Sequence, residues 1–365
     1  MATPKETLWA IEPHTKAKHE ILKRYLEAWF PILNKYHGKI IYIDGFCGPG
    51  KYIGGELGSP LIALNVAATH RKAITGEIIF WFIDSRPDRI EHLKKELSSL
   101  SYPSHFKIIP HLGKFHEIFG AILEQLEKDN SRIAPTFAFV DPFGFSGIPY
   151  SLISGLLKHS QCEVLITFMV DSINRWLEHP DSKILEHITE AFGTEDALNL
   201  IQKPGKIDRI QELRSLYQNQ LKKLATFVRY FEMRDFHNKP IYYLFFASNH
   251  RLGNLKFKEA MWKIDPGGEF RFSDATDPNQ MVLFEADHTS QVLNLLMKGF
   301  KGKKNVSCEE IKLFVEDHTP FLEKHMRSAL KIAETSGRIE VMKQKADGKK
   351  RKINTFPDNA IITFV

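Results

Sequence analysis

The alternation of short apolar runs with amphipathic segments constrains the fold of this chain more than any other feature of its sequence. Apolar runs of strand length occupy residues 39–44, 77–84, 105–111, 136–140 and 162–170, and segments with helical spacing of apolar residues lie between them. Strands that alternate with helices of this length predict an α/β domain, in which a parallel sheet carries helices on both faces.

Two later segments have a different character. Residues 172–235 are more polar and helical in pattern, and we expect them to form a helical insertion or cap within an α/β domain that spans residues 1–286. Residues 287–365 predict three short helices followed by two strands, the order of a winged helix-turn-helix domain. In that domain residues 323–336 would form the recognition helix, and Asp347-Gly348 would turn the hairpin.

The composition argues against several classes of protein. The chain has no run of about 18 apolar residues that could span a membrane, and its first residues lack the apolar core of a secretory signal. The three cysteines (Cys47, Cys162 and Cys308) are too scattered to predict a disulfide framework or a zinc site, and the 16 histidines show no ligand spacing. We therefore expect a cytoplasmic protein with no metal site.

A glycine-rich loop follows the first predicted strand. The stretch IDGFCGPGK (43–51) contains Asp44 at the strand end, and the glycines that follow have the order G-x-x-G-x-G. A dinucleotide fingerprint has the order G-x-G-x-x-G and enters a helix at once, whereas here Ser59-Pro60 is the next helix start. A phosphate-binding P-loop needs Ser or Thr after its lysine, but Lys51 is followed by Tyr52.

An acidic residue before a glycine turn suits S-adenosylmethionine (SAM), which carries an ammonium and a sulfonium but no phosphate. Asp84, at the end of the second strand, would accept hydrogen bonds from both ribose hydroxyls. Ligands of open α/β sheets bind at the carboxyl ends of the strands, where these acids would meet. The alternative is a structural crossover with ordinary strand-end acids. The candidate cofactor-binding residues are Asp44, Gly45, Phe46, Gly48, Gly50 and Asp84.

The motif Asp-Pro-Phe-Gly follows the fourth strand and supplies the candidate catalytic residues. An exocyclic amine on a base ring is a poor nucleophile, so the Asp141 carboxylate and the Pro142 carbonyl could accept its two hydrogens. Phe143 could stack on a base turned out of its helix. Gly144 completes the motif, whose composition also fits a simple turn.

The positive charge of the chain is concentrated near its C-terminus. Of a formal net charge of +6, residues 287–365 carry +5, which favours an anionic partner for this part. At a hairpin tip these side chains would lie along phosphates, although a solvated basic surface is the alternative. The candidate nucleic-acid-binding residues are Lys324, Arg327, Lys331, Lys345, Lys349, Lys350, Arg351 and Lys352.

Four stretches together resemble the three-Cys-motif partner proteins, the bacterial family called TcmP. They are KHEILKRYLEAWFPILNK (18–35), YIDGFCGPGKYIGGELGSPLIAL (42–64), FAFVDPFG (137–144) and YYLFFASNHRLGNLKFKEAMW (242–262). The resemblance covers most of residues 15–265 and implies a class I SAM-dependent methyltransferase fold. It also implies a partner with three clustered cysteines, similar to radical-SAM iron–sulfur proteins. The Asp-Pro-Phe-Gly motif is similar to that of tRNA guanine-N2 dimethyltransferases.

Three functional hypotheses follow. The leading one is a SAM-dependent methyltransferase that acts on an exocyclic or ring amino nitrogen of a nucleic-acid base, in DNA or RNA. The second is a non-catalytic or accessory partner of the three-Cys-motif protein in nucleic-acid repair or modification. The third is a protein-binding adaptor in which the α/β domain is a scaffold.

Overall fold

The computed structural model describes residues 4–202, 206–276, 287–342 and 351–365. The chain divides into two compact units, Met1–Asp265 with Phe270–Gln280 and Pro266–Glu269 with Met281–Val365. The sequence-based boundary after residue 286 lies at the end of a stretch outside the described residues. No helix in the described part of the chain is long and apolar enough to cross a membrane.

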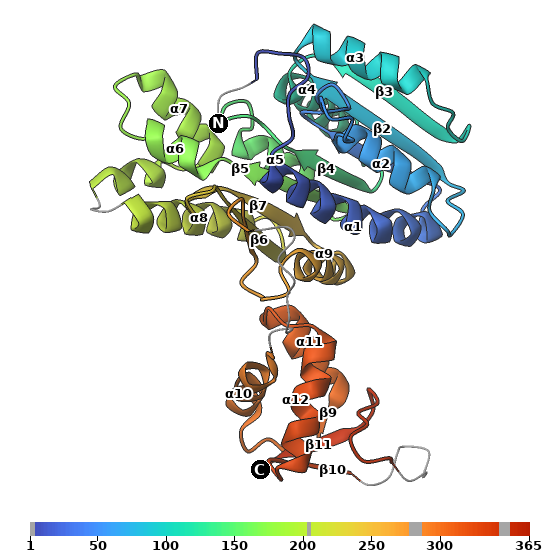
Figure 1. Ribbon diagram of the computed structural model, residues 1–365, viewed down its shortest axis with the longest axis vertical. Coiled ribbons are helices and arrows are strands. Elements are labelled where there is room, and N and C mark those ends of the chain that lie inside the picture. Colours follow the sequence, from blue (N-terminus) through green and yellow to red (C-terminus); the bar gives the residue numbers. More distant parts are fainter. Residues whose placement is uncertain (1–3, 203–205, 277–286, 343–350) are drawn as a thin grey trace. The chain divides into compact units, whose positions relative to one another are not determined.

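The first unit is built on an eight-stranded sheet with the order β3-β2-β1-β4-β5-β7-β6-β8 (Figure 1). Strands β1 to β5 are mutually parallel, whereas β7 runs antiparallel between β5 and β6. The antiparallel β7 distinguishes this sheet from the dinucleotide-binding order 3-2-1-4-5-6. The strands are β1 (Lys39–Asp44), β2 (Glu77–Asp84), β3 (Phe106–Leu112), β4 (Thr136–Val140), β5 (Cys162–Phe168), β6 (Phe227–Arg234), β7 (Pro240–Ser248) and β8 (Arg271–Ser273).

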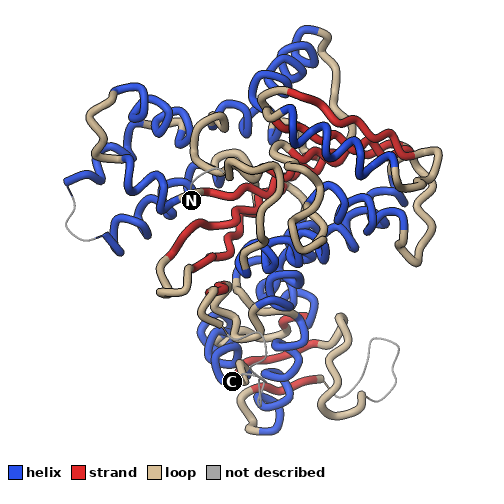
Figure 2. Tube along the Cα trace, turned by 45° about the horizontal axis from the view of Figure 1, so that its top comes forward, coloured by secondary structure: helices blue, strands red, loops and turns tan. Residues whose placement is uncertain are grey.

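Helices cover both faces of this sheet, and each face has its own apolar core (Figure 2). One core packs α1 (Pro13–Tyr36), α2 (Ser59–Ala68), α3 (Pro87–Ser98) and α9 (Arg251–Ile264) against the sheet. The other contains α4 (Phe115–Lys128), α5 (Tyr150–Leu157), α6 (Val170–Trp176), α7 (Ser182–Phe192) and α8 (Lys206–Lys222), with the 3₁₀ helix Glu195–Gln202 beside them.

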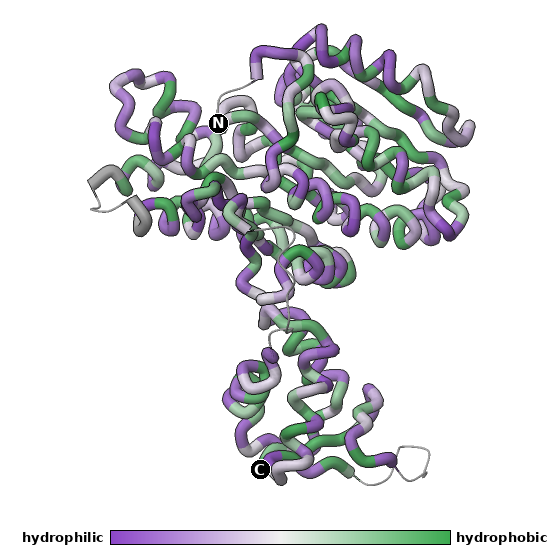
Figure 3. The backbone as a smooth tube through the Cα atoms, viewed as in Figure 1, coloured by the Kyte–Doolittle hydropathy of each residue, from purple (hydrophilic) through white to green (hydrophobic). Residues whose placement is uncertain are grey.

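The hydropathy of each element follows its burial. Every residue of β4 and β5 is buried, since both faces of these central strands are covered. In Figure 3, α2 is coloured hydrophobic along most of its length and α3 alternates, in keeping with seven buried residues in α2 and three in α3. The predicted α/β fold class, a mostly parallel sheet with helices on both faces, is confirmed.

Two details of the sequence-based prediction are wrong. Residues 172–235 are not all helical, because 227–234 form β6, whose residues pair with β7 along its length. The sequence FVRYFEMR, in which three charged residues interrupt the apolar ones without regular alternation, hid this strand, and its partners lie later in the chain. Helix α2 begins at Ser59 with Gly58 as its N-cap, so Pro60 stands one position further into the first turn than expected.

The second unit contains three helices and a small sheet. The helices are α10 (Thr289–Phe300), α11 (Cys308–His318) and α12 (Glu323–Thr335), and the sheet has the order β10-β11-β9. Strands β10 (Ile339–Val341) and β11 (Ile361–Phe364) are the predicted antiparallel pair, and β9 (Val306–Ser307) adds a third strand that the sequence did not predict. The predicted hairpin turn at Asp347-Gly348 lies outside the described residues.

Candidate functional site

Three carboxylates meet at the carboxyl edge of the sheet. Asp44 ends β1, Asp84 ends β2 and Asp141 directly follows β4. Burial, with smaller contributions from the nearby charges of Asp141 and Asp84, raises the pKa of Asp44 to about 7, although hydrogen bonds from Ser59 and Phe46 act to lower it. Asp44 Oδ2 is buried and accepts no hydrogen bond from the described residues. This edge therefore concentrates negative charge and holds an unsatisfied acceptor.

The glycine loop is fixed to β2 through Asp84. Its Oδ2 accepts a hydrogen bond from the Gly48 N–H at 3.0 Å, its Oδ1 accepts one from the Arg86 N–H at 2.8 Å, and Arg89 Nη1 lies 3.7 Å from Oδ2. Gly48 (φ +63°) and Gly50 (φ +86°) adopt backbone conformations that other residues rarely take. Asp84 thus holds the loop, and its role toward a ribose remains a prediction.

Gly45 and Phe46 pack closely against Phe115 at the start of the loop. A Cβ atom on Gly45 would lie 2.8 Å from the ring of Phe115, so only glycine fits there without movement. Phe46 donates its backbone N–H to Asp44 Oδ1 at 3.4 Å, and its ring lies 6.0 Å from that of Phe115. The loop therefore turns tightly around the end of β1.

Asp141 is engaged by a residue that the sequence did not single out. Lys18, on α1, donates from Nζ to both carboxylate oxygens at 2.7 and 2.6 Å, and the Thr167 hydroxyl donates to Oδ1 at 2.5 Å. The side chain of Lys18 is 7% exposed and that of Asp141 is 20% exposed. Lys18 lies 123 residues before Asp141 in the chain, so no local sequence pattern links the two residues.

A cavity of about 340 Å³ opens beside this ion pair. Its walls include Asp141, Pro142 and Phe143, the motif that the sequence predicted as catalytic. The ammonium of Lys18 also lies 5.2 Å from the ring centre of Tyr242, within range of a cation–π contact. Gly144 points instead toward a smaller cavity of about 20 Å³, which Pro142 also lines. The motif therefore borders a cavity that Asp141 lines, whereas Asp44 and Asp84 are not among its lining residues.

Residues 4–12 lie over the glycine loop. The ring of Trp9 is 5.6 Å from that of Phe143 and 4.8 Å from the Arg89 guanidinium carbon. A Cβ on Gly48 would lie 3.7 Å from the Trp9 ring, and Pro4 O accepts hydrogen bonds from Arg86 and Arg89 at 2.7 and 3.1 Å. This N-terminal strap therefore contacts both the predicted cofactor loop and the predicted target motif.

The predicted nucleic-acid-binding residues divide into three groups. Lys324, Lys331 and Lys352 are exposed, and Lys331 and Lys352 line a cleft of about 510 Å³. Lys345, Lys349 and Lys350 lie outside the described residues.

Arg327 and Arg351 both bond to acceptors of their own unit. Arg327 donates to Glu323 Oε1 at 2.7 Å and to the Phe356 carbonyl. Arg351 is 5% exposed and pairs with Glu334. Both tie the loop after residue 350 to α12. The side chain of Arg351 therefore turns inward, against the expectation, whereas that of Arg327 is 36% exposed and lines the cleft together with Lys331 and Lys352.

Metal-ligating side chains and thiols are the other groups that could carry chemistry. Among the described residues, no group of three or more His, Cys, Asp or Glu is arranged to hold a metal ion. Cys47, Cys162 and Cys308 are buried free thiols, and burial raises the pKa of Cys162 to about 12 and that of Cys308 to about 11. Such thiols are poor nucleophiles.

Residues 271–346 match the family model described as a GMT-like wHTH domain. Together with α10–α12 and the β10-β11-β9 sheet, this match shows that the chain ends in a winged helix-turn-helix domain. The curated proteins contain no match to the chain.

Several solved structures are similar over most of the chain at low sequence identity. Protein LPL1258 from Legionella pneumophila, of the family DUF519, is 12% identical over 70% of this chain and 93% of its own, with a TM-score of 0.39. Trm1 from Pyrococcus horikoshii, solved with S-adenosyl-L-methionine, is 11% identical over 70% of this chain and 60% of its own (TM-score 0.36). Human methyltransferase-like protein 13, solved with SAH, is 10% identical over 74% of this chain and 96% of its own, with a TM-score of 0.36.

Proposed function

We propose that this protein is a SAM-dependent methyltransferase that acts on an exocyclic or ring amino nitrogen of a nucleic-acid base. The observation that carries the proposal is the convergence of Asp44, Asp84 and Asp141 at the carboxyl edge, beside a glycine loop and a cavity. The order of the sheet and the resemblance to methyltransferases support the same interpretation.

The carboxylates at this edge of the sheet fit the charges of SAM. The cofactor carries two positive charges, and Asp44 offers a buried, unsatisfied oxygen with neighbouring carboxylates. Asp84 keeps the loop in place while Gly48 and Gly50 let the backbone approach a ligand closely. When bound, SAM supplies an electrophilic methyl group.

Asp141 is the proposed acceptor of the target amine. Lys18 and Thr167 use three of the roughly four lone-pair positions of its carboxylate. Lys18 illustrates that a nitrogen donor fits at 2.6–2.7 Å from this group. An amine would use the remaining position or compete with Lys18, while the Pro142 carbonyl accepts its second hydrogen. A base stacked on Phe143 would take the place of the Trp9 edge.

The winged helix-turn-helix domain would supply affinity for the nucleic-acid backbone. Lys324, Lys331 and Lys352 are its exposed cations among the predicted residues. We expect the affinity for a duplex to fall linearly with salt on logarithmic axes, since phosphate contacts release counterions. A triple Lys→Gln variant at these positions should reduce that slope, and a flat slope for the wild type would contradict backbone binding.

The test of methyl transfer uses tritiated SAM with total tRNA and genomic DNA as separate acceptors. We expect label in one of them, and Asp141→Ala should abolish transfer while calorimetry still detects SAM binding. Full transfer by Asp141→Ala would rule out its role. The DNA and RNA arms also identify the class of substrate.

A second function is favoured by the engagement of Asp141. Because Lys18 and Thr167 already hold its carboxylate, the domain could bind SAM as an accessory partner of a three-Cys-motif protein without transferring the methyl group. SAM binding without transfer to tRNA, DNA or that partner would support this function. The absence of SAM binding would instead favour the adaptor hypothesis.

A further inference from the structure

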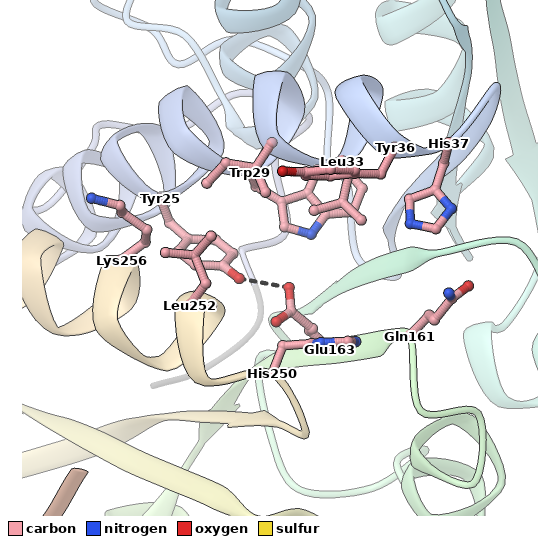
Figure 4. Close-up of a pocket in the computed structure, with 12 residues that line it drawn as sticks. Tyr25, Trp29, Leu33, Tyr36, His37, Gln161, Glu163, His250, Leu252 and Lys256 are labelled. Carbon is pink, nitrogen blue, oxygen red and sulfur yellow. Dashed lines mark hydrogen bonds between the residues drawn. The ribbon is translucent and has the colours of Figure 1, made fainter. Parts of the chain in front are cut away.

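A second cavity lies at the opposite, amino edge of the sheet. It has a volume of about 230 Å³ and is formed by the C-terminal half of α1, the start of β5 and the first turns of α9. Figure 4 shows Tyr25, Trp29, Leu33, Tyr36 and His37 entering it from the α1 side and Glu163 and Gln161 from the β5 side. None of these residues belongs to the carboxyl-edge site.

The floor of this cavity holds a buried carboxyl group. Glu163 is 3% exposed, and its oxygens accept hydrogen bonds from the Tyr25 and Ser248 hydroxyls, each at 2.6 Å. No ion pair with Glu163 is formed by the residues that the structure describes. Burial raises its pKa, while hydrogen bonds from Ser248, Tyr25 and Trp29 and the charge of His250, which also lines the cavity, act to lower it. Buried carboxylates are rarely left without a positive partner.

The walls of the cavity are suited to a positive charge. Tyr25 and Trp29 line it together with Tyr36, which is 69% exposed at the rim and whose ring centre lies 5.1 Å from the Lys35 ammonium. Aromatic faces attract cations, most strongly where water is excluded. The last turn of α1 ends at His37, and the carbonyl end of a helix also favours positive charge.

Two features that would favour an anion are already occupied. The first turn of α9 is approached by Glu163 itself, since a Cβ on Gly253 would lie only 2.1 Å from Glu163 Oε1. Lys256 lines the cavity, but its ammonium pairs with Glu259 Oε2 at 2.8 Å. The cavity therefore favours a cation over an anion.

We propose that this amino-edge pocket binds an organic monocation, an ammonium or guanidinium group with an apolar or aromatic body. The charged group faces Glu163, whose two hydrogen bonds leave lone pairs free, and the body lies between Trp29, Tyr36 and Leu252. A cavity of about 150 Å³ holds a benzene ring, so this one takes a somewhat larger group. The ligand is a free amine or the basic side chain of another protein.

The experiment titrates the full-length protein by calorimetry with three probes of similar shape. They are 2-phenylethylammonium, uncharged 2-phenylethanol and anionic phenylacetate. We expect the ammonium to bind at least about tenfold more tightly than the alcohol, and phenylacetate to bind most weakly. An N-acetyl-trimethyllysine amide forms the second arm. Tighter binding of this amide indicates a protein side chain as the natural ligand, whereas tighter binding of the arylamine indicates a free amine.

Two variants locate the binding. Glu163→Gln keeps the size of the side chain and should remove the preference for the ammonium while changing the affinity for the alcohol by less than about twofold. Tyr36→Ala, at an exposed position that the fold does not need, should weaken ammonium binding several-fold. Equal affinity for ammonium and alcohol, no binding of the ammonium, or an unchanged preference in Glu163→Gln would overturn the proposal.

Discussion

The two edges of the sheet each hold a carboxyl group, partly exposed in Asp141 and buried in Glu163, and their surroundings differ. At the carboxyl edge, Asp141 is paired with the Lys18 ammonium and a hydroxyl. At the amino edge, Glu163 has two hydroxyl donors. The first group thus has an ammonium as its partner, whereas the second is held by neutral hydroxyls and burial raises its pKa. The comparison shows that two carboxyl groups of one sheet can differ in the kind of donor that holds them, an ammonium for Asp141 and hydroxyls for Glu163.

The largest expected effect comes from breaking the ion pair at the carboxyl edge. Lys18→Met leaves the Asp141 charge without its cation, which costs about 2–3 kcal/mol of unfolding free energy, reduced by the partial exposure of Asp141. Urea unfolding measures this loss. The double variant with Asp141→Asn should recover most of it, and a loss of less than about 0.5 kcal/mol in Lys18→Met would contradict a structural ion pair.

Crowding the amino edge should have the next largest effect. Gly253→Ala places a methyl group 2.1 Å from Glu163 Oε1, so the carboxyl group must move away from its hydroxyl donors. We expect a loss of about 1–3 kcal/mol in urea unfolding. Gly38→Ala is the matched control, because nothing lies within 4 Å of a Cβ there. Equal stability of the two variants would show that Glu163 is not held tightly.

A third prediction concerns the pH dependence of cofactor binding at the carboxyl edge. The pKa of Asp44 is raised to about 7, so the group is mostly protonated below that pH, whereas a cationic ligand favours the ionised form. SAM affinity should fall about tenfold per pH unit below about pH 7. Calorimetry in buffers of different ionisation enthalpy should detect proton release at pH 7. Asp44→Asn should lose the pH dependence, and a flat affinity from pH 8 to 6 in the wild type would contradict it.

The smallest effect is expected from neutralising Glu163. A carboxyl group whose pKa is raised on folding stabilises the fold below its usual pKa of 4.5, and this contribution is lost as the pH rises through the raised pKa. Glu163→Gln should therefore be less stable than the wild type near pH 4.5 and equal or up to about 1 kcal/mol more stable at pH 8. The nearby titratable groups are Tyr25 and His250.

Urea unfolding of Glu163→Gln and the wild type across pH 4.5–8 measures this difference, with and without 2-phenylethylammonium. The bound cation should stabilise the wild type at pH 8 and leave the variant unchanged. A difference in stability that does not depend on pH would show that Glu163 keeps one charge state throughout.

Much of the first unit could be predicted from the sequence because its signals are local. The runs KIIYID, EIIFWFID and TFAFV became β1, β2 and β4, with bounds that match the sequence-based ranges. Apolar runs of this length are stable only as buried strands between helical layers. Strand β6 was missed, since its polar residues are compatible with a helix until β7 pairs with it.

The sequence by itself determined the sheet, the glycine turn and the positions of Asp44, Asp84 and Asp141 at strand ends, because the chain direction of a parallel sheet brings strand ends to one edge. Only the tertiary structure decided the partners of these and other charged groups. Lys18 reaches Asp141 because α1 packs across the sheet, and Arg351 turns inward because Glu334 lies beside it. Partner choice depends on distances between segments far apart in the chain, and no local pattern of residues encodes those distances.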